Sequence, residues 1–254
     1  MHTVDTIMPQ NVRLRVHIAP VGFEIDRVVI PAMEMKADRV YLLRHDNHAE
    51  DKSGPYLEKI AKKLENEGIE TKTIDVNRFT LFGIIRVVKE IIQAERDHDI
   101  YLNIASGSKI HAVGCMMGAM IFDDRANIHP YYAQAKEYPT YKGKEQQTFG
   151  VEDIHDLPTY QIRTPPPKLL EALSIIKAED RITKKRLAEI ADQHNLITVG
   201  AREENFQQAR FASLDKTIIH PLEHDWGFVK VEKVGRNRII TLTKEGRHAS
   251  EFLI

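Results

Sequence analysis

The chain has 254 residues and a formal net charge of −1, enough for an α/β core with one small appended domain, and this charge excludes a generally basic protein that coats nucleic acid. Its single cysteine, Cys115, excludes an internal disulfide framework and indicates a reducing compartment. No apolar run reaches the roughly 18 residues that a membrane span needs, and residues 1–10 lack the apolar core of a signal peptide. We therefore expect a soluble, cytoplasmic protein without a membrane partner.

The first half of the chain alternates predicted strands and helices. Short apolar runs predict five strands, and amphipathic spacing predicts four helices between them. This alternation predicts a Rossmann-like α/β domain over residues 1–133, with a doubly wound parallel sheet. In chain order the elements are strand Arg13–Ile18, helix Phe23–Met35, strand Asp38–Leu43, helix Pro55–Glu67, strand Ile69–Val76, helix Thr80–Arg96, strand Asp99–Ile104, a helix from Lys109 to about Met120, and strand Ile128–Ala133.

Sheets of this class bind ligands beyond the carboxyl ends of their strands, where the strand order reverses. Three loops compete for that position: Ala19–Phe23, Arg44–Ser53 and Ala105–Lys109. The first and third follow strands that we expect at the centre of the sheet. These two loops are therefore the best candidates for a ligand site.

The Ala105–Lys109 turn joins small polar residues to a helix start, where backbone N–H groups and the helix dipole favour anions. It fits neither a Walker phosphate loop, because Ile110 follows Lys109, nor a dinucleotide fingerprint, because the first loop offers only Gly22. We interpret it as a pocket for a nucleotide-like anion; the alternative is an ordinary tight turn. The candidate ligand-binding residues are Pro20, Val21, Gly22, Phe23, Asn103, Ala105, Ser106, Gly107, Ser108 and Lys109.

Other polar clusters have simpler explanations. His45-Asp46-Asn47-His48 with Asp51 is more typical of a polar loop than of a metal site, and the pair His111 and Cys115 is more typical of a packed core. No spacing indicates a Ser–His–Asp or paired-carboxylate arrangement. We therefore expect no catalytic residue, no metal site and no cofactor.

Residues 134–167 change to a polar composition with five prolines, three of them in the stiff run Pro165–Pro167. We interpret this segment as a connector that holds one extra edge strand, at the alternating stretch Thr159–Ile162.

Residues 168–254 predict a separate domain. Helices are expected at Lys168–Ala178, Lys184–His194 and about residues 202–220, followed by strands Trp226–Val231 and Arg238–Leu242 and a last helix that begins at Thr243. Three helices and then a hairpin are the order of a winged helix-turn-helix, which binds double-stranded DNA. Residues 161–254 carry 16 basic and 13 acidic side chains, whereas residues 1–160 carry 20 and 24, so the C-terminal part is the better DNA-binding half.

Long cationic side chains on one surface contact phosphates, and amides or hydroxyls reach base edges. The pair Arg236 and Arg238, at the predicted hairpin tip, is the most specific indication of DNA binding. The candidate DNA-binding residues are Lys184, Lys185, Arg186, Arg202, Gln207, Arg210, Lys216, Arg236 and Arg238, with Gln208 and Ser213 also able to reach bases.

Three stretches carry a resemblance to a known family. Asn103-Ile104-Ala105-Ser106-Gly107-Ser108-Lys109 resembles an Asn-hydrophobic-Ser/Thr-Gly-Gly-Thr/Ser-Lys pattern. The stretch from Pro221-Leu222-Glu223 through Gly235-Arg236, followed by Leu242-Thr243-Lys244-Glu245-Gly246, resembles a common winged-helix ending. On these residues the chain is similar to archaeal CARF regulators, in which a CRISPR-associated Rossmann-fold domain precedes a winged helix-turn-helix. Ala105 and Ser106 depart from the pattern, which has a small hydroxyl and a glycine there.

The resemblance implies a CARF-like homodimer with one ligand pocket on its two-fold axis, formed by both Ser106–Lys109 turns and both Ala19–Phe23 loops. The implied ligand is a cyclic oligoadenylate such as cyclic tetra-adenylate. It implies a ligand-responsive transcriptional regulator. Two alternatives stay open: a ring nuclease or other phosphodiesterase in which Ser106, Ser108 and Lys109 act on the ligand, and a DNA-binding dimer with an empty sensor domain.

Overall fold

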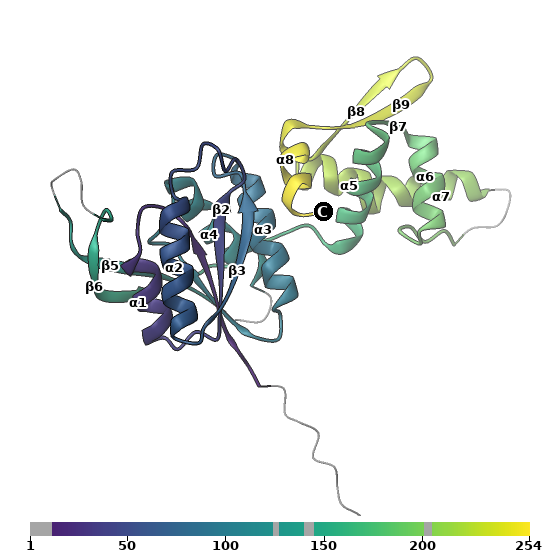
Figure 1. The fold of residues 1–254 in the computed structure, drawn as a ribbon. Helices are drawn as coiled ribbons and strands as arrows, with labels where there is room; N and C mark the ends of the chain where they lie inside the picture. Colours follow the sequence, from purple (N-terminus) through teal and green to yellow (C-terminus); the bar gives the residue numbers. More distant parts are fainter. Residues whose placement is uncertain (1–11, 124–126, 140–144, 201–204) are drawn as a thin grey trace, which may run out of the picture. The chain divides into compact units, whose positions relative to one another are not determined.

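A computed structural model describes residues 12–123, 127–139, 145–200 and 205–254 (Figure 1). The chain divides into two compact units, Met1–Ile162 and Arg163–Ile254, which are described separately below. Among the described residues, every helix is too short or too polar to cross a bilayer.

The first unit is built on a six-stranded sheet in the order β3-β2-β1-β4-β5-β6. Strands β1 to β5 are parallel, and β6 runs antiparallel to β5. The strands are β1 (Arg15–Pro20), β2 (Arg39–His45), β3 (Glu70–Val76), β4 (Asp99–Asn103), β5 (Ile128–Glu137) and β6 (Phe149–Asp156). The helices are α1 (Asp26–Glu34), α2 (Gly54–Asn66), α3 (Leu81–Ala94) and α4 (Lys109–Phe122).

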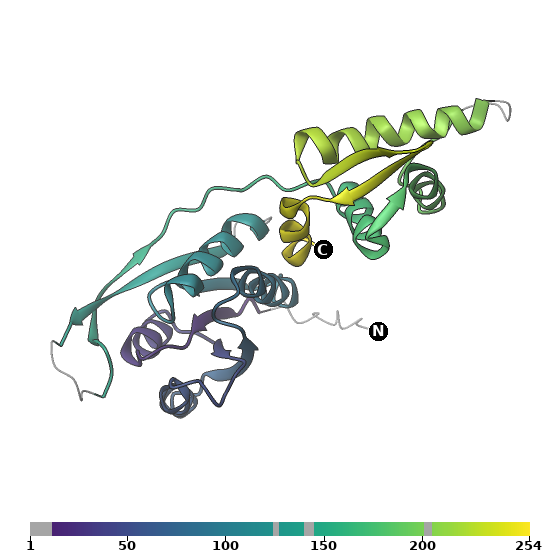
Figure 2. The same cartoon turned by 90° about the horizontal axis from the view of Figure 1, so that it is seen from above.

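Figure 2 shows helices on both faces of this sheet. Each face has its own apolar core. Helices α1 and α2 cover one face, where Val28 and Ile60 pack on the strands, and α3 and α4 cover the other, where Val88 and Cys115 do. The central strand β1 is buried from Val16 to Pro20 because it has helices on both faces. The doubly wound α/β prediction is therefore confirmed.

The extra edge strand is not where the sequence predicted it. Residues 159–162 form no strand, and Tyr160 is 73% exposed. The strand is β6, because β5 continues past Ala133 to Glu137 and the chain then returns to pair with it in antiparallel register. The alternation of Thr159–Ile162 was a misleading signal, since a strand also needs a free neighbour with which to pair.

The second unit contains α5 (Pro167–Glu179), β7 (Arg181–Thr183), α6 (Lys184–Gln193), α7 (Phe206–Leu214), β8 (Val229–Val234), β9 (Asn237–Leu242) and α8 (Lys244–Phe252). Its strands form an antiparallel sheet in the order β7-β9-β8, and its helices enclose a core that includes Leu173, Leu187 and Ile218. Thr183 and Thr243 cap α6 and α8 by accepting the N–H groups of Arg186 and Gly246. This order and sheet form a winged helix.

The third helix of this unit extends further than predicted. Two π-helical segments, Asp215–Ile219 and Pro221–Asp225, follow α7, so strand β8 begins at Val229 instead of Trp226. Pro221 has no N–H for an ordinary helical bond to Thr217, and the bonds widen instead: Trp226 donates its N–H to Pro221 O at 3.0 Å. Residues 201–204, which include Arg202, lie outside the described residues.

Candidate functional site

The strand order reverses between β1 and β4, so the loops that follow these two strands lie at the same edge of the sheet. Their backbones touch: a Cβ atom at Gly22 would lie 3.1 Å from both Cα and N of Gly107. The expectation that the first and third candidate loops follow central strands is confirmed.

The turn between β4 and α4 is fixed against the β1 loop by two residues. The buried Ser106 donates its Oγ–H to the carbonyl oxygen of Pro20. Gly107 has φ +80°, and a Cβ there would lie 2.6 Å from Pro20 Cβ. Only glycine therefore fits at position 107 without displacing the neighbouring loop.

Asn103, the last residue of β4, fixes the first residue of the turn by hydrogen bonds. It is fully buried; its Nδ2 donates to Arg27 O at 2.7 Å, and its Oδ1 accepts from Ala105 N at 2.8 Å. Pro20 and Val21 are buried as well. Four of the candidate ligand residues are therefore buried and support the turn without lining its surface: Pro20, Val21, Asn103 and Ser106.

Ser108 and His111 close the first turn of α4. Ser108 Oγ accepts from His111 N at 3.2 Å, and Ser108 N donates to His111 Nδ1 at 3.1 Å. Because Nδ1 is an acceptor here, the proton of the neutral ring is on Nε2. Burial, with the nearby charges of Arg78 and His45, lowers the pKa of His111 to about 4. The cap therefore stays intact at neutral pH.

The N-terminus of α1, at the same edge, is filled by the chain itself. Gln146 Oε1 accepts from Ile25 N at 2.7 Å and from Asp26 N at 3.0 Å. Thr148 hydrogen-bonds Glu24, and Gly150 N donates to Asp26 Oδ2 at 2.9 Å. The segment before β6 thus occupies the position where a dinucleotide-binding sheet holds phosphate.

The accessible part of the site is the outer side of the β4–α4 turn. Gly107 and Lys109 are exposed, and the side chain of Lys109 makes no hydrogen bond or ion pair with any residue that the structure describes. Gly22 and Phe23 are half-buried beside it, and Ile110 and Val113 on α4 are 39% and 48% exposed. A free cation at a helix N-terminus remains open to an anion.

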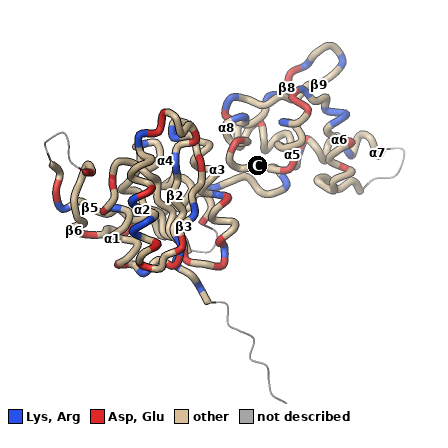
Figure 3. Tube along the Cα trace, in the orientation of Figure 1, with Lys and Arg blue, Asp and Glu red and all other residues tan. Residues whose placement is uncertain are grey.

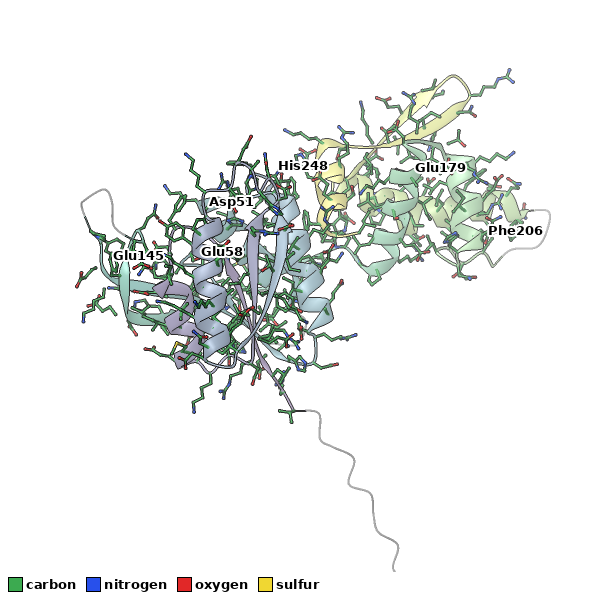
Figure 4. The ribbon with its side chains drawn as sticks, viewed as in Figure 1. Asp51, Glu58, Glu145, Glu179, Phe206 and His248 are labelled. Atoms are coloured by element: carbon green, nitrogen blue, oxygen red, sulfur yellow. The ribbon has the colours of Figure 1, made fainter. Side chains whose placement is uncertain are left out.

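Arg78, which sequence reasoning missed, adds a second cation next to the turn. It lies in the loop after β3, where its Nη1 is 3.7 Å from Asp51 Oδ1. Its positive charge helps to lower the pKa of His111. Asp51, labelled in Figure 4, has a side chain that is only 2% exposed. A single arginine in a loop carries no sequence signal; only the sheet topology brings it here. The described residues contain no cluster of three or more His, Cys, Asp or Glu able to hold a metal ion.

In the second unit, a cleft of about 280 Å³ joins the start of α6 to the β8–β9 hairpin, the wing. Figure 3 shows the basic residues of the wing tip in blue. Lys185, Arg236 and Arg238 make no ion pair with any described residue, so their charges are available to a partner. The cleft is lined by Thr183, Lys184, Lys185, Phe211, Arg236, Asn237 and Arg238.

The other DNA candidates have different surroundings. Lys184 is paired with Asp215 at 2.5 Å, and Arg210 is mostly buried with its Nη1 3.6 Å from Asp192. Arg186 and Gln207 are exposed outside the cleft. Lys216 lines a separate cavity at the far end of the same helix. The wing and the start of α6 are thus the cationic surface that the fold brings together.

Comparison with family models finds matches in both units. Residues 15–138 match a model described as "HFX_2341_N:-like, N-terminal", and residues 168–254 match "DUF6293 C-terminal winged helix domain". The second match agrees with the winged-helix order of α5 to α8. Each unit is thus similar to a separate domain family.

A curated relative is the uncharacterized protein MJ1513 of Methanocaldococcus jannaschii, which is 27% identical over 191 residues. The match covers 66% of this chain and 57% of that protein. The chain therefore spans little more than half of the length of this relative.

Three solved structures are similar at low identity. Can2 from Sulfobacillus thermosulfidooxidans, solved with cyclic tetra-adenylate, is 15% identical with a TM-score of 0.41 over 93% of this chain and 63% of that one. Csm6 from Enterococcus italicus, bound to cyclic hexa-2'-fluoro-hexa-dAMP, is 11% identical with a TM-score of 0.42 over 84% and 56%. VC1899 from Vibrio cholerae is 11% identical with a TM-score of 0.41 over 93% and 64%.

Proposed function

We propose that this protein is a ligand-responsive DNA-binding regulator, in which the β4–α4 turn binds a nucleotide-like anion and the winged helix binds double-stranded DNA. The observation that carries the proposal is the wing cleft, where Lys185, Arg236 and Arg238 converge without internal partners. Unpaired cations on a wing and at the start of the second helix of a winged helix suit the phosphate backbone of a duplex.

The DNA half is tested by fluorescence anisotropy with a labelled duplex at several salt concentrations. The double variant Arg236→Ala and Arg238→Ala is expected to bind more weakly at every sequence and to lower the salt slope by roughly 2, because two phosphate contacts are lost. Arg86→Ala, an exposed arginine on α3 of the first unit, is the control and should leave the slope unchanged. An unaltered slope in the double variant would remove the wing from the proposal.

The ligand half rests on the open turn beside Lys109. Helices α1 and α4 follow the two central strands β1 and β4; because Gln146 fills the N-terminus of α1, the N-terminus of α4 is the one of these two that stays open to an anion. A cyclic oligoadenylate, such as cyclic tetra-adenylate, is the ligand that we propose, on the pattern Asn103 to Lys109. Its symmetry matches a pocket formed by two copies of the turn across a two-fold axis.

A homodimer would supply the second copy. Ile110 and Val113 lie on the exposed side of α4, next to the turn, where a partner's α4 can cover them. Light scattering after gel filtration is expected to give the mass of two chains, and Val113→Lys is expected to shift the population to one. A monomeric wild-type protein would contradict the shared pocket.

We favour binding over cleavage of the ligand. The hydroxyls of Ser106 and Ser108 are engaged in hydrogen bonds that hold the turn, which supports a sensor over a ring nuclease. Incubation with cyclic tetra-adenylate and analysis of the products should return intact ligand; linear products would establish the enzymatic alternative.

A further inference from the structure

The second unit contains a larger cavity than the wing cleft, and the two share no residue. Its volume is about 680 Å³, within the range of small-molecule sites. It lies between the start of α5 and the C-terminal end of the long helix that begins as α7. The lining residues are Arg163, Pro166, Lys168, Leu169, Lys216, Thr217, Pro221, Asp225 and Trp226.

The widened helix builds one wall of this cavity. Figure 2 shows α7 and the two π-helical segments as one continuous helix of the second unit. In these segments His220 N bonds Asp215 O and Trp226 N bonds Pro221 O, each five residues back. Side chains roughly five residues apart therefore share a face, which brings Lys216, Pro221 and Asp225 to the cavity. π-Helical turns are often found at functional sites.

The side chains that line the cavity have a net positive charge, which favours an anionic ligand. Arg163, Lys168 and Lys216 make no hydrogen bond or ion pair through their side chains with any residue in the described parts of the chain. Asp225 is the one acidic residue in the lining, so the cavity has a formal charge of +2. Three unpaired cations around one concave surface attract a polyanion such as a phosphate chain.

The remaining lining suits a flat heterocycle. Leu169 is buried, and with Pro166, Pro221 and the indole of Trp226 it forms an apolar surface. An indole face stacks on a nucleobase, and the Asp225 carboxylate accepts hydrogen bonds from amino groups such as those on base edges. Thr217 Oγ donates to Ser213 O at 2.7 Å, so its free lone pairs can accept a further hydrogen bond.

We propose that this cavity is a second ligand site that binds a nucleoside phosphate, with the base against Trp226 and the phosphates between Lys168, Lys216 and Arg163. This site is independent of the β4–α4 turn and of the wing cleft. Lys216, which the sequence suggested for DNA contact, here serves the ligand. Because Lys216 lies five residues after Phe211, which lines the wing cleft, ligand and DNA engage neighbouring turns of the same long helix.

The test uses the intrinsic fluorescence of the full chain. Trp226 is its single tryptophan, so a change in tryptophan emission reports directly on this cavity. Titration with ATP is expected to change the emission saturably, and inorganic tripolyphosphate is expected to bind at least about tenfold more weakly because it has no base to stack. The double variant Lys168→Glu and Lys216→Glu should raise the apparent Kd for ATP at least about tenfold.

Two control variants separate this site from the others. Lys185→Glu makes the same kind of charge change in the wing cleft, and Lys109→Ala removes the cation of the β4–α4 turn; both should leave the Kd within about twofold. The proposal is overturned by an emission that does not saturate with ATP, by equal affinity for tripolyphosphate, or by an equal loss in either control. Circular dichroism of each variant confirms that it is folded.

Discussion

Helices α1 and α4 follow the two central strands of the first sheet, and their N-termini differ in whether the chain itself occupies them. The N-terminus of α1 follows the central strand β1, and Gln146 occupies its free N–H groups. The N-terminus of α4 follows the adjacent strand β4, is capped only by Ser108, and has the unpaired Lys109 in its first turn. Of these two helix N-termini, one is thus filled by the chain and the other is open to an anion.

A position where a fold can bind a ligand is therefore a site only if the rest of the chain leaves that position free. The segment that blocks α1 lies some 120 residues further along the chain, between β5 and β6. At the turn before α4, Ser106 and Gly107 contact Pro20, and the outer side of the turn at Lys109 stays exposed. The predictions below test these two assignments.

Gly107→Ala should lower the unfolding free energy more than any other substitution proposed here. The substitution places a Cβ 2.6 Å from Pro20 Cβ at a residue with φ +80°, and we expect the first unit to lose about 3 kcal/mol or more of unfolding free energy. Gly68→Ala is the matched control, since Gly68 also has positive φ but no atom within 4 Å of the added Cβ, and it should cost about 1 kcal/mol. Urea unfolding measures both. Equal losses would show that the two loops are not in contact.

The cap of α4 should make stability depend on pH. The pKa of His111 is lowered to about 4 in the folded chain from its ordinary 6.5, so between these values the unfolded chain binds more protons. Stability therefore falls as the pH drops from 6.5 to 4, with up to about 3 kcal/mol from this residue.

His111→Gln should flatten this part of the profile of unfolding free energy against pH. His17 also contributes to the slope, because burial and Arg15 lower its pKa to about 3, but it does so in both proteins. The difference between the two profiles therefore isolates His111. Identical slopes would contradict the neutral, capping histidine.

Gln146→Ala should have a smaller effect and no pH dependence. The variant leaves the N–H groups of Ile25 and Asp26 without their acceptor, and loss of such a cap costs about 1 kcal/mol. Gln147→Ala, at the exposed neighbouring residue, should be neutral in the same thermal and urea measurements. If both variants behave alike, Gln146 is not the residue that fills the α1 position.

The sequence predicted the parallel sheet and the winged helix because both depend on local periodicity. The runs that became β1, β2 and β4 are apolar enough to be buried, and Thr183 and Thr243 are recognisable caps. The turn Ala105–Lys109 was also identified, since small residues between a strand and a helix are visible without a structure. Such local patterns predict secondary structure because they depend on residues close together in the sequence.

What the sequence could not predict depends on long-range contacts. Asn103 and Ser106 have polar side chains that are typical of a ligand site. Both are buried, however, and donate hydrogen bonds to backbone carbonyl oxygens that are distant in the sequence. Lys184 and Arg210 are cations like Arg236, but Asp215 and Asp192 pair with them. The side chain alone does not say whether its partner is a ligand or another part of the chain.

Calorimetric titration with cyclic tetra-adenylate tests the central claim, that the N-terminus of α4 and not that of α1 is the ligand site. Wild type and Gln146→Ala should bind with similar affinity, whereas Lys109→Ala should bind at least about tenfold more weakly while its DNA affinity without ligand stays unchanged. Intact binding by Lys109→Ala, or no binding by the wild type, would contradict this account.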